Sequence, residues 1–240
     1  MSTYDTKLAA RDIVARDTMT FEFERPQGFD FKAGQWMDIT LVDTAVAEAQ
    51  GARHTFSIVS APFENKLAIA TRMRDSPFKR ALKLMPVGTQ VRIDGPHGSL
   101  TLHRETLRAA VMIAGGIGIT PFLSMARQAS NDQAPQCLFL VFSNRRPEDA
   151  PFISELTQLE RVNASFRLVA TMTQPNKSNI HWNGRTGYID EHMLRQVTGN
   201  LAEPIYYLAG PPVMVEAIRE TLVDMGVADG AVRSEEFWGY

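Results

Sequence analysis

The period of the hydrophobic pattern changes near the middle of this chain, and this change limits the possible folds more than any other feature. In residues 18–24, Phe21 and Phe23 fall on one face of a strand and acidic residues on the other. Further short strands, bounded by glycine and proline turns, are predicted at residues 35–42, 54–60, 67–73 and 90–93. Such strands predict an antiparallel β-barrel, interrupted by one helix from Ser76 to about Leu84.

The second half of the chain alternates buried strands with helices. Residues 109–114 form a continuous apolar run, which is typical of a strand buried on both faces. Further strands are predicted at 137–142, 166–171 and 205–209, and helices from Pro121 and at 148–160, 190–197 and 213–225. This alternation predicts a parallel sheet with right-handed crossovers. The expected domains are a barrel at residues 1–105 and an α/β domain at residues 106–240.

Composition and charge exclude several classes of protein. The net charge of −2 offers no basic surplus for nucleic acid or anionic lipid. No apolar run approaches the roughly 18 residues of a spanning helix, and the N-terminus lacks a signal-peptide core, so we expect a cytoplasmic protein. The single cysteine, Cys137, excludes an internal disulfide, an iron–sulfur cluster and a structural zinc site. We expect no metal site, and we interpret Cys137 as a small buried core residue.

A glycine-rich loop at residues 114–121, Ala-Gly-Gly-Ile-Gly-Ile-Thr-Pro, joins a buried strand to a helix. Its glycines allow a ligand to approach the backbone, and Pro121 suits the first helical turn. The exposed N–H groups and the helix dipole favour an anion such as a pyrophosphate. The alternative is that the glycines serve strand–helix packing alone. The loop also departs from the common G-x-G-x-x-G dinucleotide fingerprint.

A second strand–helix turn, at residues 208–214, repeats this design. Both turns follow buried strands and should therefore lie at the same carboxyl edge of the sheet, where ligands bind. Another predicted strand ends in Asn144, Arg145 and Arg146. These two arginines could contact a ribose or a phosphate, and a solvated charged turn explains them equally well. Together the turns predict a nucleotide site.

Six segments occur in the order found in the ferredoxin–NADP reductase superfamily, and the chain therefore resembles that family over nearly its whole length. They are the glycine loop 115–121, Gly-Pro-Pro at 210–212, Ala-Gly-Gln at 33–35, His-Thr-Phe-Ser at 54–57, Gly-Pro-His-Gly at 95–98 and the aromatic-rich end 235–240. The resemblance implies an antiparallel flavin-binding barrel followed by a parallel-sheet nicotinamide-binding domain. It implies hydride transfer between NADPH or NADH and a bound flavin, with FAD favoured over FMN. Electrons would then leave to a redox partner protein or a small-molecule acceptor.

By the same resemblance, Ser57 and Glu235 tune charge and hydrogen bonding near the reactive flavin nitrogen. Thr120 would line the nicotinamide pocket, and Phe237 or Tyr240 would stack on the flavin. The implied flavin contacts are Arg53, His54, Thr55, Phe56, Ser57, Thr71, Arg72, Arg74, Ser76, Phe237 and Tyr240. The implied nucleotide contacts are Gly115, Gly116, Gly118, Thr120, Pro121, Asn144, Arg145, Arg146, Gly210, Pro211, Pro212 and Met214.

Simpler roles compete with three of these assignments. Phe56 alone could be a core aromatic, and Ser76, expected to begin a pyrophosphate-binding helix, could be a plain N-cap. The C-terminal aromatics could cover an apolar groove or a dimer partner. One motif also departs from the family, because His54 stands where an arginine is usual and Arg53 lies one residue early. A backbone bulge or a different donor would then have to serve the flavin phosphate.

Two other functions compete with the flavin enzyme. A non-catalytic nucleotide-binding protein or partner subunit could retain the reductase fold. A flavin-free dehydrogenase would need a general acid, and the sequence presents no His–Asp pair at an obvious spacing. The colour of the purified protein separates both from a flavoprotein.

Overall fold

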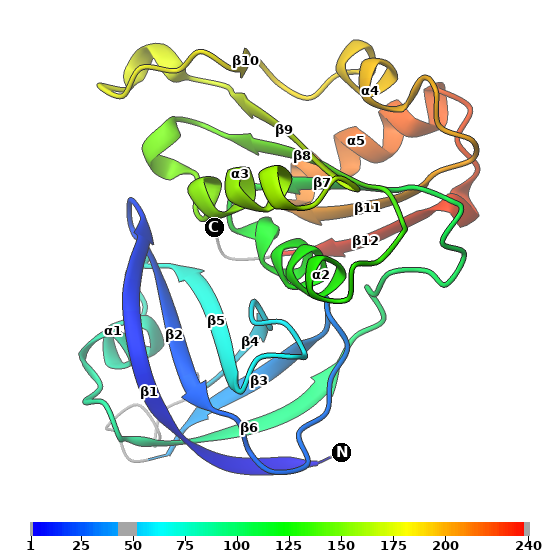
Figure 1. The fold of residues 1–240 in the computed structure, drawn as a ribbon. Coiled ribbons are helices and arrows are strands. Elements are labelled where there is room, and N and C mark those ends of the chain that lie inside the picture. Colours follow the sequence, from blue (N-terminus) through cyan, green and yellow to red (C-terminus); the bar gives the residue numbers. More distant parts are fainter. Residues whose placement is uncertain (1, 43–51, 238–240) are drawn as a thin grey trace.

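The structure, a computed structural model, describes residues 2–42 and 52–237. Two six-stranded sheets lie one above the other, with the barrel below and the α/β layer above in Figure 1. The first half of the chain supplies β1 (Thr3–Ala15), β2 (Thr18–Glu24), β3 (Trp36–Leu41), β4 (Arg53–Ser57), β5 (Lys66–Arg72), α1 (Pro77–Leu84) and β6 (Gln90–His97).

The first sheet has the order β4-β3-β6-β1-β2-β5, and each of its strand pairs is antiparallel. The chain beyond β4 reaches β5 at the other edge, because the Val59 N–H donates to the Ala68 carbonyl at 2.8 Å. The sheet thus curls around a core that includes Phe21 and Phe23, both fully buried as their alternation predicts. The expected antiparallel barrel is confirmed.

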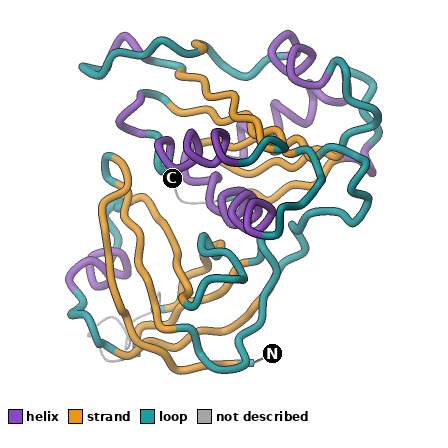
Figure 2. Tube along the Cα trace, viewed as in Figure 1, coloured by secondary structure: helices purple, strands orange, loops and turns teal. Residues whose placement is uncertain are grey.

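The second half supplies β7 (Ala110–Gly115), α2 (Thr120–Asn131), β8 (Leu138–Asn144), α3 (Ile153–Val162), β9 (Phe166–Met172), β10 (Arg185–Thr186), α4 (Glu191–Thr198), β11 (Ile205–Gly210), α5 (Pro212–Asp224) and β12 (Val232–Glu236). The sheet order is β10-β9-β8-β7-β11-β12, and all of these pairs are parallel. Helices α2 and α3 cover the face toward the barrel, and α4 and α5 cover the opposite face (Figures 1 and 2). The expected parallel sheet is also confirmed.

The barrel and the α/β layer share contacts at their junction. Val59 and Leu100 belong to the same hydrophobic cluster as Phe122 of α2. At the tip of the β1–β2 hairpin, the Arg16 N–H donates to the Glu148 carbonyl at 2.8 Å, and their side chains form an ion pair at 3.1 Å. The expected domain boundary at residues 105–106 falls in the connection between β6 and β7 and stays a prediction.

Some sequence-based expectations were wrong in detail. Cys137 is exposed rather than buried, because it precedes β8 and lies outside the buried part of that strand. The helix expected at 148–160 is divided into a 3₁₀ turn, Pro147–Asp149, and α3. Strands β1, β10 and β12 were not predicted. Within residues 2–42 and 52–237, no helix is both long enough and apolar enough to cross a membrane.

Candidate functional site

A first cavity, of about 710 Å³, lies between the barrel, the start of α2 and the C-terminal segment. Its lining is Asp38, Arg53, His54, Thr55, Phe56, Ser57, Ala70, Thr71, Arg72, Lys79, Ile117, Thr120, Glu235, Glu236 and Phe237. Strand β4 therefore contributes all five of its residues, as the resemblance implies. The volume falls within the roughly 300–1,000 Å³ of small-molecule sites.

Two buried oxygens in this cavity have no hydrogen-bond partner among the described residues. Ser57 is 7% exposed, and its Oγ has no hydrogen-bond partner among the described residues. The same holds for Oε2 of Glu235 on β12. Burial raises the pKa of the Glu235 carboxyl from 4.5 to about 7. Because buried polar groups are almost always hydrogen-bonded, these atoms indicate a ligand with complementary donors and acceptors.

Aromatic side chains supply the apolar surface of the first cavity. Phe56 is 9% exposed and its ring centroid lies 5.8 Å from that of Phe78 on α1. Phe237 follows β12 near the C-terminus. Its N–H donates to the Gly210 carbonyl at 3.0 Å, and its side chain packs on the hydrophobic core of the α/β layer. Tyr240, the alternative stacking residue, lies outside the described residues.

A second cavity, of about 590 Å³, lies at the carboxyl edge of the parallel sheet. Its lining is Arg72, Arg74, Gly115, Gly116, Ser143, Asn144, Arg145, Thr173, Gln174, Tyr188, Ile189, Pro211, Val213, Met214, Ala217 and Ile218. Asn144 is 5% exposed, and neither of its amide atoms has a hydrogen-bond partner in the described part of the chain. Arg72 lines both cavities, and its Nη2 donates to the Asp149 carbonyl at 3.3 Å. The two sites therefore adjoin.

The glycines of the loop serve two different roles: Gly116 leaves space for a ligand, and Gly118 allows close strand–helix packing. Gly116 has φ +55° and faces the second cavity, where an added Cβ would come no closer than 3.8 Å to the Arg72 Nη2. An added Cβ on Gly118 would lie 2.2 Å from the Ala209 carbonyl oxygen, so close packing on β11 requires glycine there. Gly115 lines the second cavity, whereas Gly118 is absent from the described lining of both.

The other predicted nucleotide contacts are also divided between the first cavity, the second cavity and positions outside both described linings. Thr120 lines the first cavity rather than the second, and its Oγ1 donates to the Ile117 carbonyl at 3.0 Å. Pro211 and Met214 line the second cavity. Besides Gly118, the described linings of both cavities lack Pro121, Gly210 and Pro212, which instead shape the strand–helix turns.

Three polar candidates lie elsewhere than expected. Ser76 is the N-cap of α1 and accepts from the Lys79 N–H at 3.2 Å, and it is not among the described lining residues. Arg74 lines the second cavity instead of the first. Arg146 is absent from both linings, because its Nε pairs with Asp149 at 2.7 Å inside the 3₁₀ turn.

Sequence reasoning missed some lining residues. Asp38 and Lys79 of the first cavity and Tyr188 of the second carry polar or aromatic groups that had no motif around them. Lys79 had one usable signal, its position three residues after the Ser76 N-cap, which brings it into the first turn of α1.

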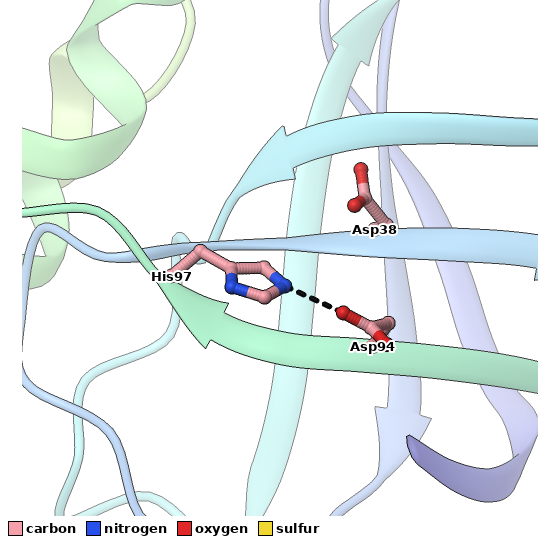
Figure 3. A group of neighbouring side chains, drawn as sticks. All are labelled: Asp38, Asp94 and His97. Carbon is pink, nitrogen blue, oxygen red and sulfur yellow. Dashed lines mark hydrogen bonds and ion pairs between the residues drawn. The ribbon is translucent and has the colours of Figure 1, made fainter. Parts of the chain in front are cut away.

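A cluster on β3 and β6 contains the His–Asp pair that was not evident in the sequence. His97 Nε2 lies 2.6 Å from Asp94 Oδ1, and Asp38 lies beside them (Figure 3). The hydrogen bond from His97 is the main cause that lowers the pKa of Asp94. The Arg53 guanidinium lies 2.6 Å from Asp38 and 3.6 Å from Asp94, and the Thr55 hydroxyl donates to Asp38. These contacts make the cluster a charge-compensated part of the barrel wall.

An antiparallel barrel and a parallel α/β sheet, with adjoining cavities at their junction, define the class of flavin-dependent NAD(P)H oxidoreductases. Residues 112–220 match the family model described as the oxidoreductase NAD-binding domain. This match, together with relatives and solved structures named as ferredoxin–NADP reductases, supports the ferredoxin–NADP reductase superfamily.

Individual relatives agree with this assignment. Ferredoxin--NADP reductase B of Sorangium cellulosum is 29% identical over 227 residues, which is 90% of each chain. Reductase component 1 of terephthalate 1,2-dioxygenase from a Comamonas species is 24% identical over 93% of this chain but only 65% of its own length. A ferredoxin NADP+ reductase from Neisseria gonorrhoeae, solved with bound FAD and NADP, is 25% identical with a TM-score of 0.82 over 98% of both chains.

Proposed function

We propose that this chain holds FAD in the first cavity and NAD(P)H in the second, and that it passes electrons from the nicotinamide nucleotide through the flavin to a separate acceptor. The observation that carries the proposal is the pair of adjoining cavities, whose linings contain buried polar atoms without a hydrogen-bond partner in the described part of the chain. The similarity to a reductase solved with FAD and NADP over nearly its full length supports the choice of both cofactors.

The residues of the first cavity fit an isoalloxazine ring. Phe56 and Phe237 offer apolar aromatic surface, which suits a flat ring system. Ser57 Oγ can donate or accept a hydrogen bond, and Glu235, with a pKa of about 7, can hold a proton at neutral pH. A flavin bound there would supply hydride acceptance and one-electron release, which no side chain of the protein can perform.

The residues of the second cavity fit a nicotinamide nucleotide. The Gly116 backbone leaves open space toward the Arg72 guanidinium, so a phosphate could approach both. Asn144 offers an amide donor and acceptor inside the cavity, and Arg145 lines it from the exposed side. The chain's part in the reaction is to hold the two ligands at adjoining positions and to limit the access of water.

The acceptor is proposed to be a redox protein. One relative is named a ferredoxin–NADP reductase and another the reductase component of a dioxygenase, so both names describe transfer to another protein or component. The described residues hold no cysteine other than the exposed Cys137, so they supply no thiolate set for an iron–sulfur centre.

Anaerobic reduction of the purified protein tests this function. We expect a yellow protein whose visible flavin absorbance bleaches when NADPH or NADH is added, and whose colour returns when an oxidised ferredoxin or flavodoxin is supplied. The bound flavin is released by denaturation and identified by chromatography. A colourless protein that binds neither added FAD nor FMN would contradict the proposal and would favour a non-catalytic nucleotide-binding role.

A further inference from the structure

The first cavity is lined by four basic side chains, Arg53, His54, Arg72 and Lys79. A flavin with a phosphate or pyrophosphate needs at least one of them as a cationic partner. The sequence left open whether a backbone bulge brings Arg53 to the position of His54. The β3–β4 register runs without a shift from Thr40↔Arg53 to Trp36↔Ser57, so no such bulge exists in β4.

Arg53 and His54 are poorly suited to this task. The Arg53 guanidinium is engaged by Asp38 at 2.6 Å and lies near Asp94, so its charge is already compensated within the barrel wall. The His54 ring lies 4.3 Å from that of Phe78. Burial, followed by the positive charge of Lys79, lowers the pKa of His54, so its surroundings disfavour the charged imidazolium.

Arg72 lines both cavities rather than the first alone. Its Nη2 donates to the Asp149 carbonyl of the α/β layer at 3.3 Å, and its side chain also lines the second cavity. An added Cβ on Gly116 would lie 3.8 Å from the same Nη2, which places this guanidinium beside the nucleotide loop. The geometry therefore makes Arg72 a group shared between the two ligands.

Lys79 has the properties of a dedicated anion partner. It lies in the first turn of α1, lines the first cavity and is half-buried. Its Nζ donates to the Arg72 carbonyl at 2.8 Å, which fixes the ammonium while its other two N–H donors are available to a ligand. None of the described carboxylates forms an ion pair with it, in contrast to Arg53. Burial and then the charge of Arg74 lower its pKa, a cost that a bound anion would offset.

We propose that Lys79 is the cation that anchors the flavin phosphate in this protein. The inference rests on the proposed function and adds the residue that selects phosphorylated flavins over riboflavin. The positive end of α1 adds to the attraction, since Lys79 lies within its first turn. His54 lies in the same cavity wall.

Binding of three flavins to the full chain, stripped of its own flavin, tests the proposal without reference to activity. Riboflavin, FMN and FAD are titrated separately into the parent and into Lys79→Gln, and flavin fluorescence is followed. We expect Lys79→Gln to raise the Kd for FMN and FAD about tenfold or more, because a charged hydrogen bond is lost. The Kd for riboflavin, which carries no phosphate, should stay within about twofold of the parent.

Two further variants keep the test independent of misfolding. Lys79→Arg retains the charge and should keep most of the parent's preference for FAD over riboflavin. Lys83→Gln removes an exposed lysine from the last turn of the same helix and should leave all three affinities unchanged.

The outcomes separate this proposal from the function on which it rests. If the parent binds FAD tightly and Lys79→Gln keeps the parent's ratio of FAD to riboflavin affinity, the assignment of Lys79 is wrong while the flavoprotein assignment stands. Equal loss of riboflavin and FAD binding in Lys79→Gln also overturns it, since that result shows a structural role. A parent that binds none of the three flavins overturns both proposals.

Discussion

The buried carboxyl of Glu235 should make stability depend on pH in a way that Glu235→Gln removes. Burial raises the pKa of this group from 4.5 to about 7, so the folded protein binds its proton more tightly than the unfolded chain does. The stabilisation by the proton is complete below pH 4.5 and is lost as the pH rises through about 7. At 1.36 kcal/mol per pH unit, the charged form costs about 3 kcal/mol above pH 8.

Glutamine keeps the shape and the hydrogen-bonding capacity of the protonated acid without its titration. The difference in free energy of unfolding, variant minus parent, should therefore rise from near zero at pH 4.5 to about 3 kcal/mol above pH 8. For a chain of this size the corresponding difference in Tm is about 6–12 °C. Thermal unfolding of both proteins in parallel, from pH 4.5 to 9, measures it.

The neighbouring Glu236 provides a matched control, because it lines the same cavity from an exposed position. Glu236→Gln should leave the pH dependence of the parent unchanged. If the Tm curves of the parent and Glu235→Gln run parallel from pH 5 to 8, the carboxyl is hydrated in the folded protein and the burial argument fails.

Three further predictions separate residues that look equivalent in the sequence. Gly118→Ala should lower Tm sharply or prevent folding because its Cβ would lie 2.2 Å from a backbone oxygen, whereas Gly116→Ala should cost only about 1–2 kcal/mol and mainly weaken NAD(P)H binding. Arg145→Ala should lower the NADPH-to-NADH ratio of kcat/KM by about tenfold if Arg145 contacts a 2′-phosphate, while Arg146→Ala should leave that ratio unchanged; equal effects would refute the distinction. Phe237→Ala should shift the flavin absorbance and alter the rate of hydride transfer more than it lowers Tm, and an unchanged spectrum would assign the ring to packing alone.

The hydrophobic pattern predicted those strands in which buried residues form a continuous run or a regular alternation along the sequence. Strand β7 is buried along its whole length, and its apolar run shows this directly. Strand β1 was missed because only Thr6 and Leu8 are buried among its 13 residues, so its place in the barrel depends on pairing with β2 and β6. Strand β12 was missed for a related reason, since its polar sequence forms a strand by parallel pairing with β11.

The motifs predicted which segments line the cavities better than they predicted individual contacts. All five residues of β4 line the first cavity, as the motif at residues 54–57 with the preceding Arg53 indicated. Arg145 and Arg146 could not be separated by position, yet Asp149, three residues after Arg146, was visible in the sequence and is the partner that holds it. The placement of Lys79 beside the carbonyl of Arg72 depends on how α1 packs on β5, which no sequence period reports.

The junction between the two sheets links ligand binding to domain association. Ser57 comes from the barrel and Glu235 from the last strand of the α/β layer, yet both line the first cavity. Two of the contacts between the layers, Arg16 with Glu148 and Arg72 with Asp149, lie shortly after residues 143–145, which line the second cavity. A ligand that contacts both layers stabilises their association by the same free energy with which association favours the ligand. Weakening the junction should therefore weaken both cofactor sites, even where no residue that contacts a cofactor is changed.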